Sequence, residues 1–308
     1  MTGGAGFIGS HLVDRLVGEG CDVVVLDNLS AGNMGNISQS KDRVEMVVGD
    51  IRDRSTVEKV IDGVQVVFHE AAQVNVRRSV EDPFEDLDIN VHGSLVLLEE
   101  CVKAGVEKVV YASSGGAVYG DPPSIPASEE CETNPVSPYG ASKLMVEKYL
   151  ECYYEIYGLD YVVLRYGNVF GPRQDPFGEA GVISIFLSQV LKWESPVIFG
   201  DGFQTRDFVF VGDVVEANMK ALRYDSFPRI FNIGSGVETS VNEIFSTVIR
   251  ITGVELPPKY GPERKGEVKR IVLDISRAFE KLGWAPKTSL DEGIKKTWEW
   301  MQKQPLNI

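Results

Sequence analysis

Short apolar runs alternate with longer amphipathic stretches through the first half of the 308-residue chain. The runs are rich in valine and nearly continuous, which is typical of strands that are buried on both faces of a sheet. They cover residues 22–28, 44–50, 64–72, 108–114 and 161–171. The stretches between them place apolar residues at helical spacing over 9–18, 53–62, 84–104 and 138–157. This βαβ rhythm predicts an α/β fold of the Rossmann type, with a doubly wound parallel sheet.

The pattern changes after residue 171. The segment GPRQDPFGEAG is rich in glycine and proline and carries both signs of charge, so it reads as a functional loop. Beyond it we expect a helix over 182–192, strands in VIFGD and DFVFV, a helix over 213–223, a strand in IFNIGSG and three further helices. The chain thus predicts a nucleotide-binding domain over 1–170, to which 207–236 returns, and a smaller C-terminal substrate-binding lobe formed by 171–206 and 237–308.

Charge and composition narrow the classes of partner. The net charge of −14 argues against nucleic acids and anionic membranes, because both require a basic surface. The four cysteines show no C-x-x-C spacing and no apolar run approaches the length of a membrane span, so we expect a cytoplasmic protein with reduced thiols. The three histidines lie far apart in the sequence, and no metal site is predicted.

A glycine-rich loop opens the chain. TGGAGFIGS places Gly3, Gly6 and Gly9 where the backbone can approach a pyrophosphate, whose charge would lie at the N-terminus of the next helix. This pattern alone is weak, since it also occurs in plain structural turns. Asp27 strengthens it, because an acid at the end of the next apolar run can bind the ribose hydroxyls of a dinucleotide and repel a 2′-phosphate. The loop and Asp27 together predict NAD, although Asp27 could also be a turn residue before Asn28.

The start of the chain is unusual for such a loop. A central strand normally precedes the glycines, and here only Met1 stands before Thr2. A sheet without that strand would leave backbone groups of its neighbours unpaired, at about 1–3 kcal/mol for each group. We therefore expect the true start to lie upstream.

Tyr139 and Lys143 form the second candidate site. Their i, i+4 spacing in SPYGASK puts both side chains on one helical face. A free phenol titrates near ~10, and lowering its pKa by about 3 units requires roughly 4 kcal/mol, which a lysine cation and a nicotinamide charge in a dry cleft can supply. The tyrosine could then accept a proton from a sugar hydroxyl as hydride leaves the same carbon. Without the glycine loop, the pair would read as an ordinary surface contact.

Several segments carry a resemblance to a known family. TGGAGFIGSH, HEAAQVNVRRSVEDP, NVHGS, YASSGGAVYGD, SPYGASKLMVE, LRYGNVFGPRQDPFGEAGVISIF and TRDFVFVGDVVEA resemble extended short-chain dehydrogenase/reductases, and within them UDP-glucose 4-epimerases. The resemblance implies a tightly held NAD and a UDP-sugar substrate. The sugar would lose hydride from C4 to NAD and a proton to Tyr139, rotate as a keto sugar, and regain hydride on the other face. UDP-galactose and UDP-glucose would thereby interconvert.

The resemblance also implies site residues. Lys143 would bind the nicotinamide ribose, Ser114 the sugar hydroxyl, and Asn90 would help relay the proton unless it is simply a satisfied buried amide. Asp50 and Ile51 would hold the adenine edge, or Asp50 would cap a helix. The implied cofactor residues are Gly3, Gly6, Phe7, Ile8, Gly9, Asp27, Asn28, Asp50, Ile51, Ala71, Ala72, Asn90, Ser113, Tyr139, Lys143 and Tyr166. The implied substrate residues are Asn168, Val182, Phe199, Arg206, Arg264 and Glu267. Helices 84–104 and 138–157 would pair with their mates in a homodimer.

Three positions depart from the family pattern. Gly115 replaces a serine or threonine, so Ser114 or a water would bind the sugar hydroxyl. Glu70 replaces an apolar residue, and its carboxylate is costly unless it is paired. Ile271 lies where a bulky residue excludes N-acetylated sugars, so we expect such sugars to be accepted.

Rival functions on this scaffold are a nucleotide-sugar dehydratase or decarboxylase and a non-catalytic NAD-binding sensor. A dehydratase needs an Asp–Glu pair where this chain has Gly116 and Ala117. A sensor has no need of Tyr139 and Lys143.

Overall fold

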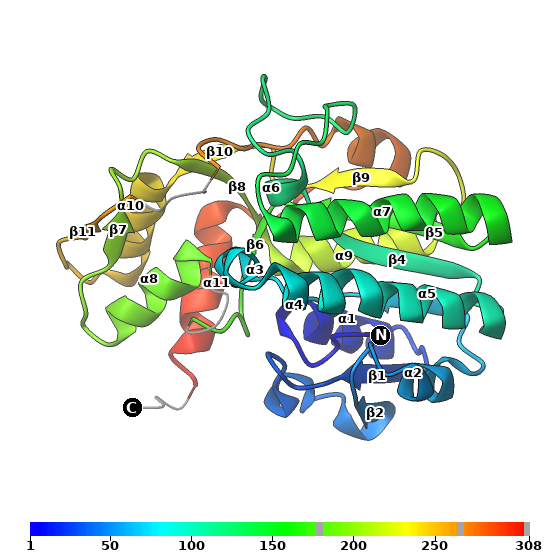
Figure 1. Cartoon of the computed structure of the whole chain (residues 1–308). Helices are drawn as coiled ribbons and strands as arrows, with labels where there is room; N and C mark the ends of the chain where they lie inside the picture. Colours follow the sequence, from blue (N-terminus) through cyan, green and yellow to red (C-terminus); the bar gives the residue numbers. More distant parts are fainter. Residues whose placement is uncertain (177–180, 264–267, 305–308) are drawn as a thin grey trace.

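A computed structural model describes residues 1–176, 181–263 and 268–304. A parallel sheet forms the centre of its larger part (Figure 1). Strands β1 (Val23–Asp27) and β2 (Val44–Val48) pair at one side of this sheet, and β3, β4, β5 and β9 follow in that order at the other. The bounds of these four strands are Val66–His69, Lys108–Ser114, Asp160–Tyr166 and Ile230–Ile233. Every pairing in the sheet is parallel, which confirms the predicted fold class.

The first three residues join the two sides of the sheet. Thr2 forms parallel bridges to Leu26 of β1 and His69 of β3. The amide of Leu26 donates to the Met1 carbonyl (2.8 Å), and the amide of Thr2 donates to the Phe68 carbonyl (3.0 Å). Met1 and Thr2 therefore occupy the central position at the carboxyl end of the sheet. The alternative of a sheet with no residues in that position is wrong. The expected upstream start stays a prediction.

Helices cover both faces of the sheet, as a doubly wound fold requires. Helices α1 (Phe7–Gly18) and α9 (Val211–Leu222) share one core cluster with β1, β4, β5 and β9. Helices α2 (Arg54–Ile61), α5 (Gly93–Ala104) and α7 (Pro138–Tyr157) belong to a second cluster on the other face. Helix α7 has the bounds that the sequence predicts, because Ser137 caps its start through the Gly140 amide and Gly158 adopts a left-handed conformation after its end.

The predicted helix over 84–104 is confirmed, with one local change of period. A π-helical turn η3 (Asp88–His92) joins α4 (Pro83–Leu87) to α5, and the backbone stays right-handed helical at both junctions. The sequence did not predict the π-helical turn. The short helices α3 (Val76–Glu81) and α6 (Gly115–Val118) and the 3₁₀ turns η1 (Met34–Ile37) and η2 (Lys41–Arg43) also escaped the sequence pattern. Their apolar repeats are too short to show a helical period.

The predicted strand over 161–171 divides at Gly167. Strand β5 stays in the parallel sheet, whereas β6 (Asn168–Phe170) pairs with β8 (Thr205–Phe210), which also pairs with β10 (Glu238–Ser240). A Cβ on Gly167 would lie 2.8 Å from the Asp207 carbonyl oxygen, so the division requires a residue without a side chain. The chain crosses here from the sheet toward the second lobe.

The smaller lobe has its own core. Helices α8 (Val182–Leu191), α10 (Val241–Thr252) and α11 (Leu290–Met301) pack through a cluster that includes Phe186, Ile244 and Ile294. Strands β7 (Val197–Phe199) and β11 (Lys259–Gly261) pair beside them, and the π-helical turn η4 (Ala278–Leu282) returns to the core of α9. Figure 1 shows this lobe beside the end of the sheet to which β6 and β8 lead. The residue limits expected for the two domains stay a prediction. Across the described residues, no helix combines the length and the apolar character of a membrane-spanning segment.

Candidate active site

The glycine loop forms a tight cradle at the start of α1. Gly3 has φ +67°, and a Cβ there would lie 2.7 Å from the Ala71 amide nitrogen. A Cβ on Gly9 would lie 2.2 Å from the Gly3 carbonyl oxygen. Phe7 and Ile8 begin α1, and amide groups in a first helical turn have no acceptor within the helix. The loop therefore fits a dinucleotide diphosphate, which needs close backbone and free N–H donors.

Asp27 ties the end of β1 to this loop. Its Oδ2 accepts a hydrogen bond from the Ala5 amide (2.9 Å), and its Oδ1 accepts one from the Leu29 amide (2.8 Å). Each carboxylate oxygen retains a lone pair that a ribose hydroxyl can use. The position suits the predicted ribose contact, which stays a prediction.

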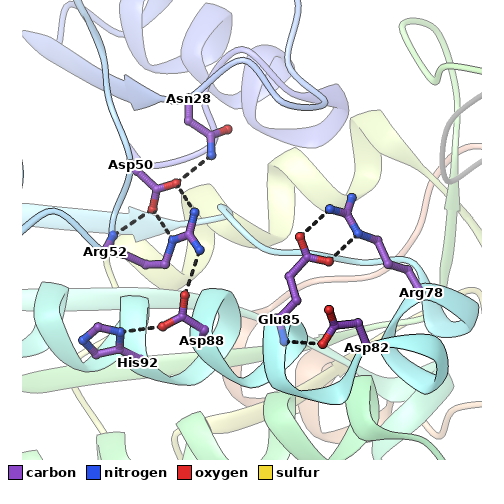
Figure 2. A network of polar contacts seen from close by, with 8 residues as sticks. All are labelled: Asn28, Asp50, Arg52, Arg78, Asp82, Glu85, Asp88 and His92. Carbon is purple, nitrogen blue, oxygen red and sulfur yellow. Dashed lines mark hydrogen bonds and ion pairs between the residues drawn. The ribbon is translucent and has the colours of Figure 1, made fainter.

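Asn28 and Asp50 belong to a polar network beside the same strand (Figure 2). The Arg52 guanidinium donates from Nε to Asp50 Oδ1 (2.9 Å) and from Nη2 to Oδ2 (2.8 Å), and Asn28 Nδ2 also donates to Oδ2 (3.0 Å). These bonds, chiefly those from Arg52, hold the pKa of Asp50 well below its usual range. Asp50 is not the cap of α2, because Asp53 accepts the bond from the Ser55 amide there. Sequence reasoning missed Arg52.

The same network reaches the π-helical turn η3. Arg52 Nη1 donates to Asp88 Oδ2 (2.8 Å), and His92 Nδ1 lies 2.9 Å from Asp88 Oδ1 (Figure 2). Nearby, Arg78 pairs with Glu85 between α3 and α4. Ile51 is buried, and a Cβ on Gly93 at the start of α5 would lie 2.7 Å from its Cγ1. Asp50 and Ile51, which are predicted to hold the adenine, are thus fixed to η3 by charge and to α5 by packing.

Tyr139 and Lys143 lie as the spacing predicts. Lys143 is 4% exposed, and its Nζ donates to the Ala112 carbonyl (2.9 Å) in β4. The same nitrogen lies 5.9 Å from the ring centroid of Tyr139 and 5.1 Å from that of Tyr111. The bond to β4 fixes a buried cation beside the half-buried phenol of Tyr139. A cation so placed favours the phenolate.

A cavity of about 520 Å³ brings the catalytic and substrate residues together. Tyr139, Ser114 and Asn168 line it from α7 and the carboxyl edge of the sheet, and the smaller lobe contributes Val182, Phe199 and Arg206. A Cβ on Gly116 would lie 3.6 Å from Asn168 Oδ1 and 3.9 Å from Ser114 Oγ, so these two polar groups face the same space. Arg264 and Glu267 lie outside the described residues.

Other lining residues were missed by sequence reasoning. They come from α3 and its cap, from the loop after β6 and from loop positions of the smaller lobe, and include Asn75, Arg77, Gln174, Gln204 and Val268. One signal could have found the first two, because the segment after β3 follows the carboxyl end of a buried strand, where ligands bind in such folds.

Three of the remaining predicted residues, Asn90, Ser113 and Tyr166, are buried. Asn90 is 2% exposed and uses its amide on the backbone of Gln73 and on Asp86 Oδ1, so it is the satisfied buried amide that the sequence left open. Ser113 donates its hydroxyl to Glu147 of α7. Ala72 follows Ala71 beside the glycine loop, and Tyr166 ends β5.

The predicted sugar gate is wrong. Ile271 is 1% exposed and packs with Val118, Tyr119 and Leu273, whereas Val268 lines the cavity instead. The acceptance of N-acetylated sugars, which rested on Ile271, therefore loses its structural basis. Packing also explains Gly115, because a Cβ there would lie 2.7 Å from Leu273 Cδ1.

Comparisons with known proteins agree with this geometry. Residues 1–234 match the model of the NAD dependent epimerase/dehydratase family. A putative UDP-glucose 4-epimerase of Methanocaldococcus jannaschii is 53% identical over 303 residues, which are 98% of this chain and 97% of that protein. The crystal structure of a UDP-glucose 4-epimerase from Thermotoga maritima with UDP-glucose has a TM-score of 0.95 at 47% identity, and covers 98% of this chain and 97% of that one. That of a Thermus thermophilus UDP-glucose 4-epimerase with NAD has a TM-score of 0.92 at 43% identity, with coverages of 99% and 98%. On the glycine cradle, the Tyr139–Lys143 pair and these similarities, the chain belongs to the NAD-dependent epimerase/dehydratase family.

Proposed function

We propose that this protein is an NAD-dependent UDP-hexose 4-epimerase that interconverts UDP-galactose and UDP-glucose. The observation that carries the proposal is a cavity that Tyr139, beside buried Lys143, lines together with Asn168, Phe199 and Arg206. Its volume of about 520 Å³ lies within the range of small-ligand sites, roughly 300–1,000 Å³. The relatives and solved structures named above support the same reaction.

The residues of the chain divide the chemistry between them. Bound NAD would supply reversible hydride transfer at C4 of the sugar. Tyr139 takes the proton of the 4-hydroxyl and returns it, and Lys143 stabilises the phenolate that forms. Ser114 positions the hydroxyl from the end of β4. The glycine loop would hold the cofactor diphosphate, and Asp27 would bind its adenosine ribose.

The substrate is held from the smaller lobe. Asn168 and Arg206 bind the diphosphate, since a guanidinium matches phosphate oxygens. Phe199 and Val182 pack against the uracil end. The proposal also assigns Arg264 to the diphosphate and Glu267 to the uridine ribose.

Positions 116 and 117 do not carry the carboxylate pair that the rival dehydratase requires. Gly116 and Ala117 both line the wall where that reaction requires a carboxylate pair, and neither can donate or accept a side-chain proton. The alternative that is not an enzyme is an NAD-binding sensor. Such a protein has no need of Tyr139, so the presence of Tyr139 favours an enzyme.

The purified protein should convert UDP-galactose into UDP-glucose with no NAD added. Proton NMR distinguishes the two sugars, and the absorbance of the denatured supernatant gives the NAD content. A preparation that holds NAD but forms no epimer would contradict the proposal. Turnover of UDP-N-acetylglucosamine, assayed as a second substrate, measures whether the cavity wall at Val268 leaves room for an N-acetyl group.

We also propose a homodimer, supported by apolar side chains on one stripe of α7. Met145, Tyr149 and Ile156 are 42%, 37% and 68% exposed and lie within about 40° of one another around the helix. In the other helix of the expected interface, Val91 of η3 and Leu98 of α5 are buried in the core of the subunit and serve intramolecular packing instead. Met145→Asp should shift the mass measured by sedimentation from dimer to monomer, while Glu107→Gln leaves it unchanged. Two monomeric proteins would refute the dimer.

A cytoplasmic location is the last part of the proposal. The four cysteines, Cys21, Cys101, Cys131 and Cys152, form no disulfide, which suits a reducing compartment.

A further inference from the structure

Glu70 is a carboxylic acid that the proposed reaction does not use. It follows β3 directly, and its amide donates to the Thr2 carbonyl (3.3 Å). A Cβ on Gly3 would lie 3.0 Å from its carbonyl carbon, so its backbone borders the glycine loop. In a doubly wound sheet the dinucleotide crosses the carboxyl ends of the central strands, with its diphosphate at this loop. Glu70 and the end of β5 thus lie on the nicotinamide side of the diphosphate.

Two residues hold this carboxylate from inside the protein. Tyr166, at the end of β5, donates its hydroxyl proton to Glu70 Oε1 (2.9 Å). Asn218 of α9 donates from Nδ2 to the Tyr166 oxygen (2.8 Å) and from the same nitrogen to the Val214 carbonyl (3.0 Å). Because Asn218 is a donor here, the only proton of the phenol must go to Glu70. The second oxygen of Glu70 accepts no hydrogen bond from the described residues.

Glu70 has both neutral and charged titratable neighbours. Burial raises the pKa of Glu70 to about 7, while the bond from Tyr166 and the charge of Lys143 act to lower it. Burial also lowers the pKa of His69 to about 3 and raises those of Tyr111 and Tyr166 well above the usual value, so these three neighbours stay neutral near pH 7. Charge in this part of the site therefore comes from Glu70 and Lys143, together with the carboxylates of Asp86 and Glu147, which act on Tyr111, and the terminal ammonium, which acts on His69.

We propose that Glu70, oriented by Tyr166 and Asn218, is a positioning and tuning residue of the cofactor site that favours oxidised over reduced dinucleotide. The nicotinamide ring is positive in NAD and neutral in NADH. A fixed carboxylate beside it attracts only the oxidised form, which offsets the opposite effect of the Lys143 cation. This inference rests on NAD binding in the proposed function and not on the identity of the sugar.

The test compares the affinities of NAD and NADH, with no sugar present. Apo protein is titrated with each dinucleotide at pH 8.5, where Glu70 is ionised, and again at pH 5.5. At pH 8.5, Glu70→Gln should raise the ratio of Kd(NAD) to Kd(NADH) on the order of tenfold, which corresponds to about 30 mV in the two-electron potential. At pH 5.5 the wild type should approach the ratio of the variant.

Controls separate charge from structure. Glu107→Gln removes an exposed carboxylate at the opposite edge of the sheet and should leave the ratio unchanged. Tyr166→Phe keeps the carboxylate but removes its hydrogen-bond donor, so it should raise the ratio of Kd(NAD) to Kd(NADH) by less than Glu70→Gln does. If Glu70→Gln does not fold, Tyr166→Phe alone tests the inference. A folded Glu70→Gln protein that binds both dinucleotides with the wild-type ratio, or weakens both equally, would overturn the inference. Epimerase activity enters none of these measurements, so failure of the proposed reaction would be seen separately.

Discussion

Tyr139→Phe should lower kcat on UDP-galactose by a factor on the order of 10²–10⁴, the usual contribution of a positioned proton-transfer group. The substitution removes the hydroxyl that exchanges the sugar proton and leaves the ring beside Lys143, whose ammonium lies 5.9 Å from its centroid. NAD content should stay at the wild-type level, because the Lys143 bond to β4 and the glycine loop are untouched. Product formation by NMR and NAD content by absorbance give the two quantities.

A second tyrosine of α7 supplies the matched control. Tyr149 is 37% exposed on the same helix, and Tyr149→Phe should leave kcat within about twofold of wild type. A Tyr139→Phe enzyme that retains more than a tenth of wild-type kcat, with its NAD in place, would remove Tyr139 from the catalytic machinery. A sensor protein would show no change in NAD binding and no activity in either variant.

Glu147→Leu should destabilise the protein by about 3–5 kcal/mol, because it leaves an uncompensated charge in the core. Glu147 and Arg165 are 0% and 3% exposed, and the guanidinium donates to both carboxylate oxygens, Nε at 3.0 Å and Nη2 at 2.6 Å. Ser113 donates to the same carboxylate, and Tyr119 accepts from Arg165 Nη1 (2.8 Å). The pair joins α7, which carries Tyr139 and Lys143, to β5, which carries Tyr166. Urea denaturation measures the loss.

An exposed pair on the same helix gives the contrast. Lys148 and Glu151 have side chains 61% and 37% exposed, and Glu151→Leu should cost no more than about 1 kcal/mol. The double variant Glu147→Leu with Arg165→Leu should recover most of the lost stability, since replacing both charges leaves none unpaired. Equal effects of Glu147→Leu and Glu151→Leu would show that the buried pair is not what holds α7 to the sheet.

Local sequence signals predicted the elements whose causes are local. Helix α7 begins and ends where expected because a serine cap, a proline at its start and a glycine after its end are all contained in the helix and its flanks. The glycine loop could also be predicted from the sequence. Its φ of +67° at Gly3 and its close backbone contacts admit only glycine, so the loop leaves a pattern of glycines in the sequence. Tyr139 and Lys143 share a face by spacing alone. From these features the sequence predicts the fold class and the central residues of the site.

Contacts between distant residues decided the rest. The sequence identified Glu70 as costly and offered no partner, and its donor Tyr166 lies 96 residues away. Ile271 was expected to contact the sugar. In the structure it is a core residue that packs with Val118 and Tyr119. The run over 161–171 reads as one strand because its apolar residues are continuous, and only the approach of Asp207 to Gly167 divides it.

The order of residues by itself determined a doubly wound sheet, a loop shaped for a diphosphate and a tyrosine one helical turn from a lysine. The tertiary structure alone decided which side chains line the cavity, which donors Glu70 and Glu147 have, and where the first three residues join the sheet. Helical and strand periods, caps and tight turns are set by neighbours along the chain. The burial and pairing of a charge are set by whatever the folded sheet brings beside it.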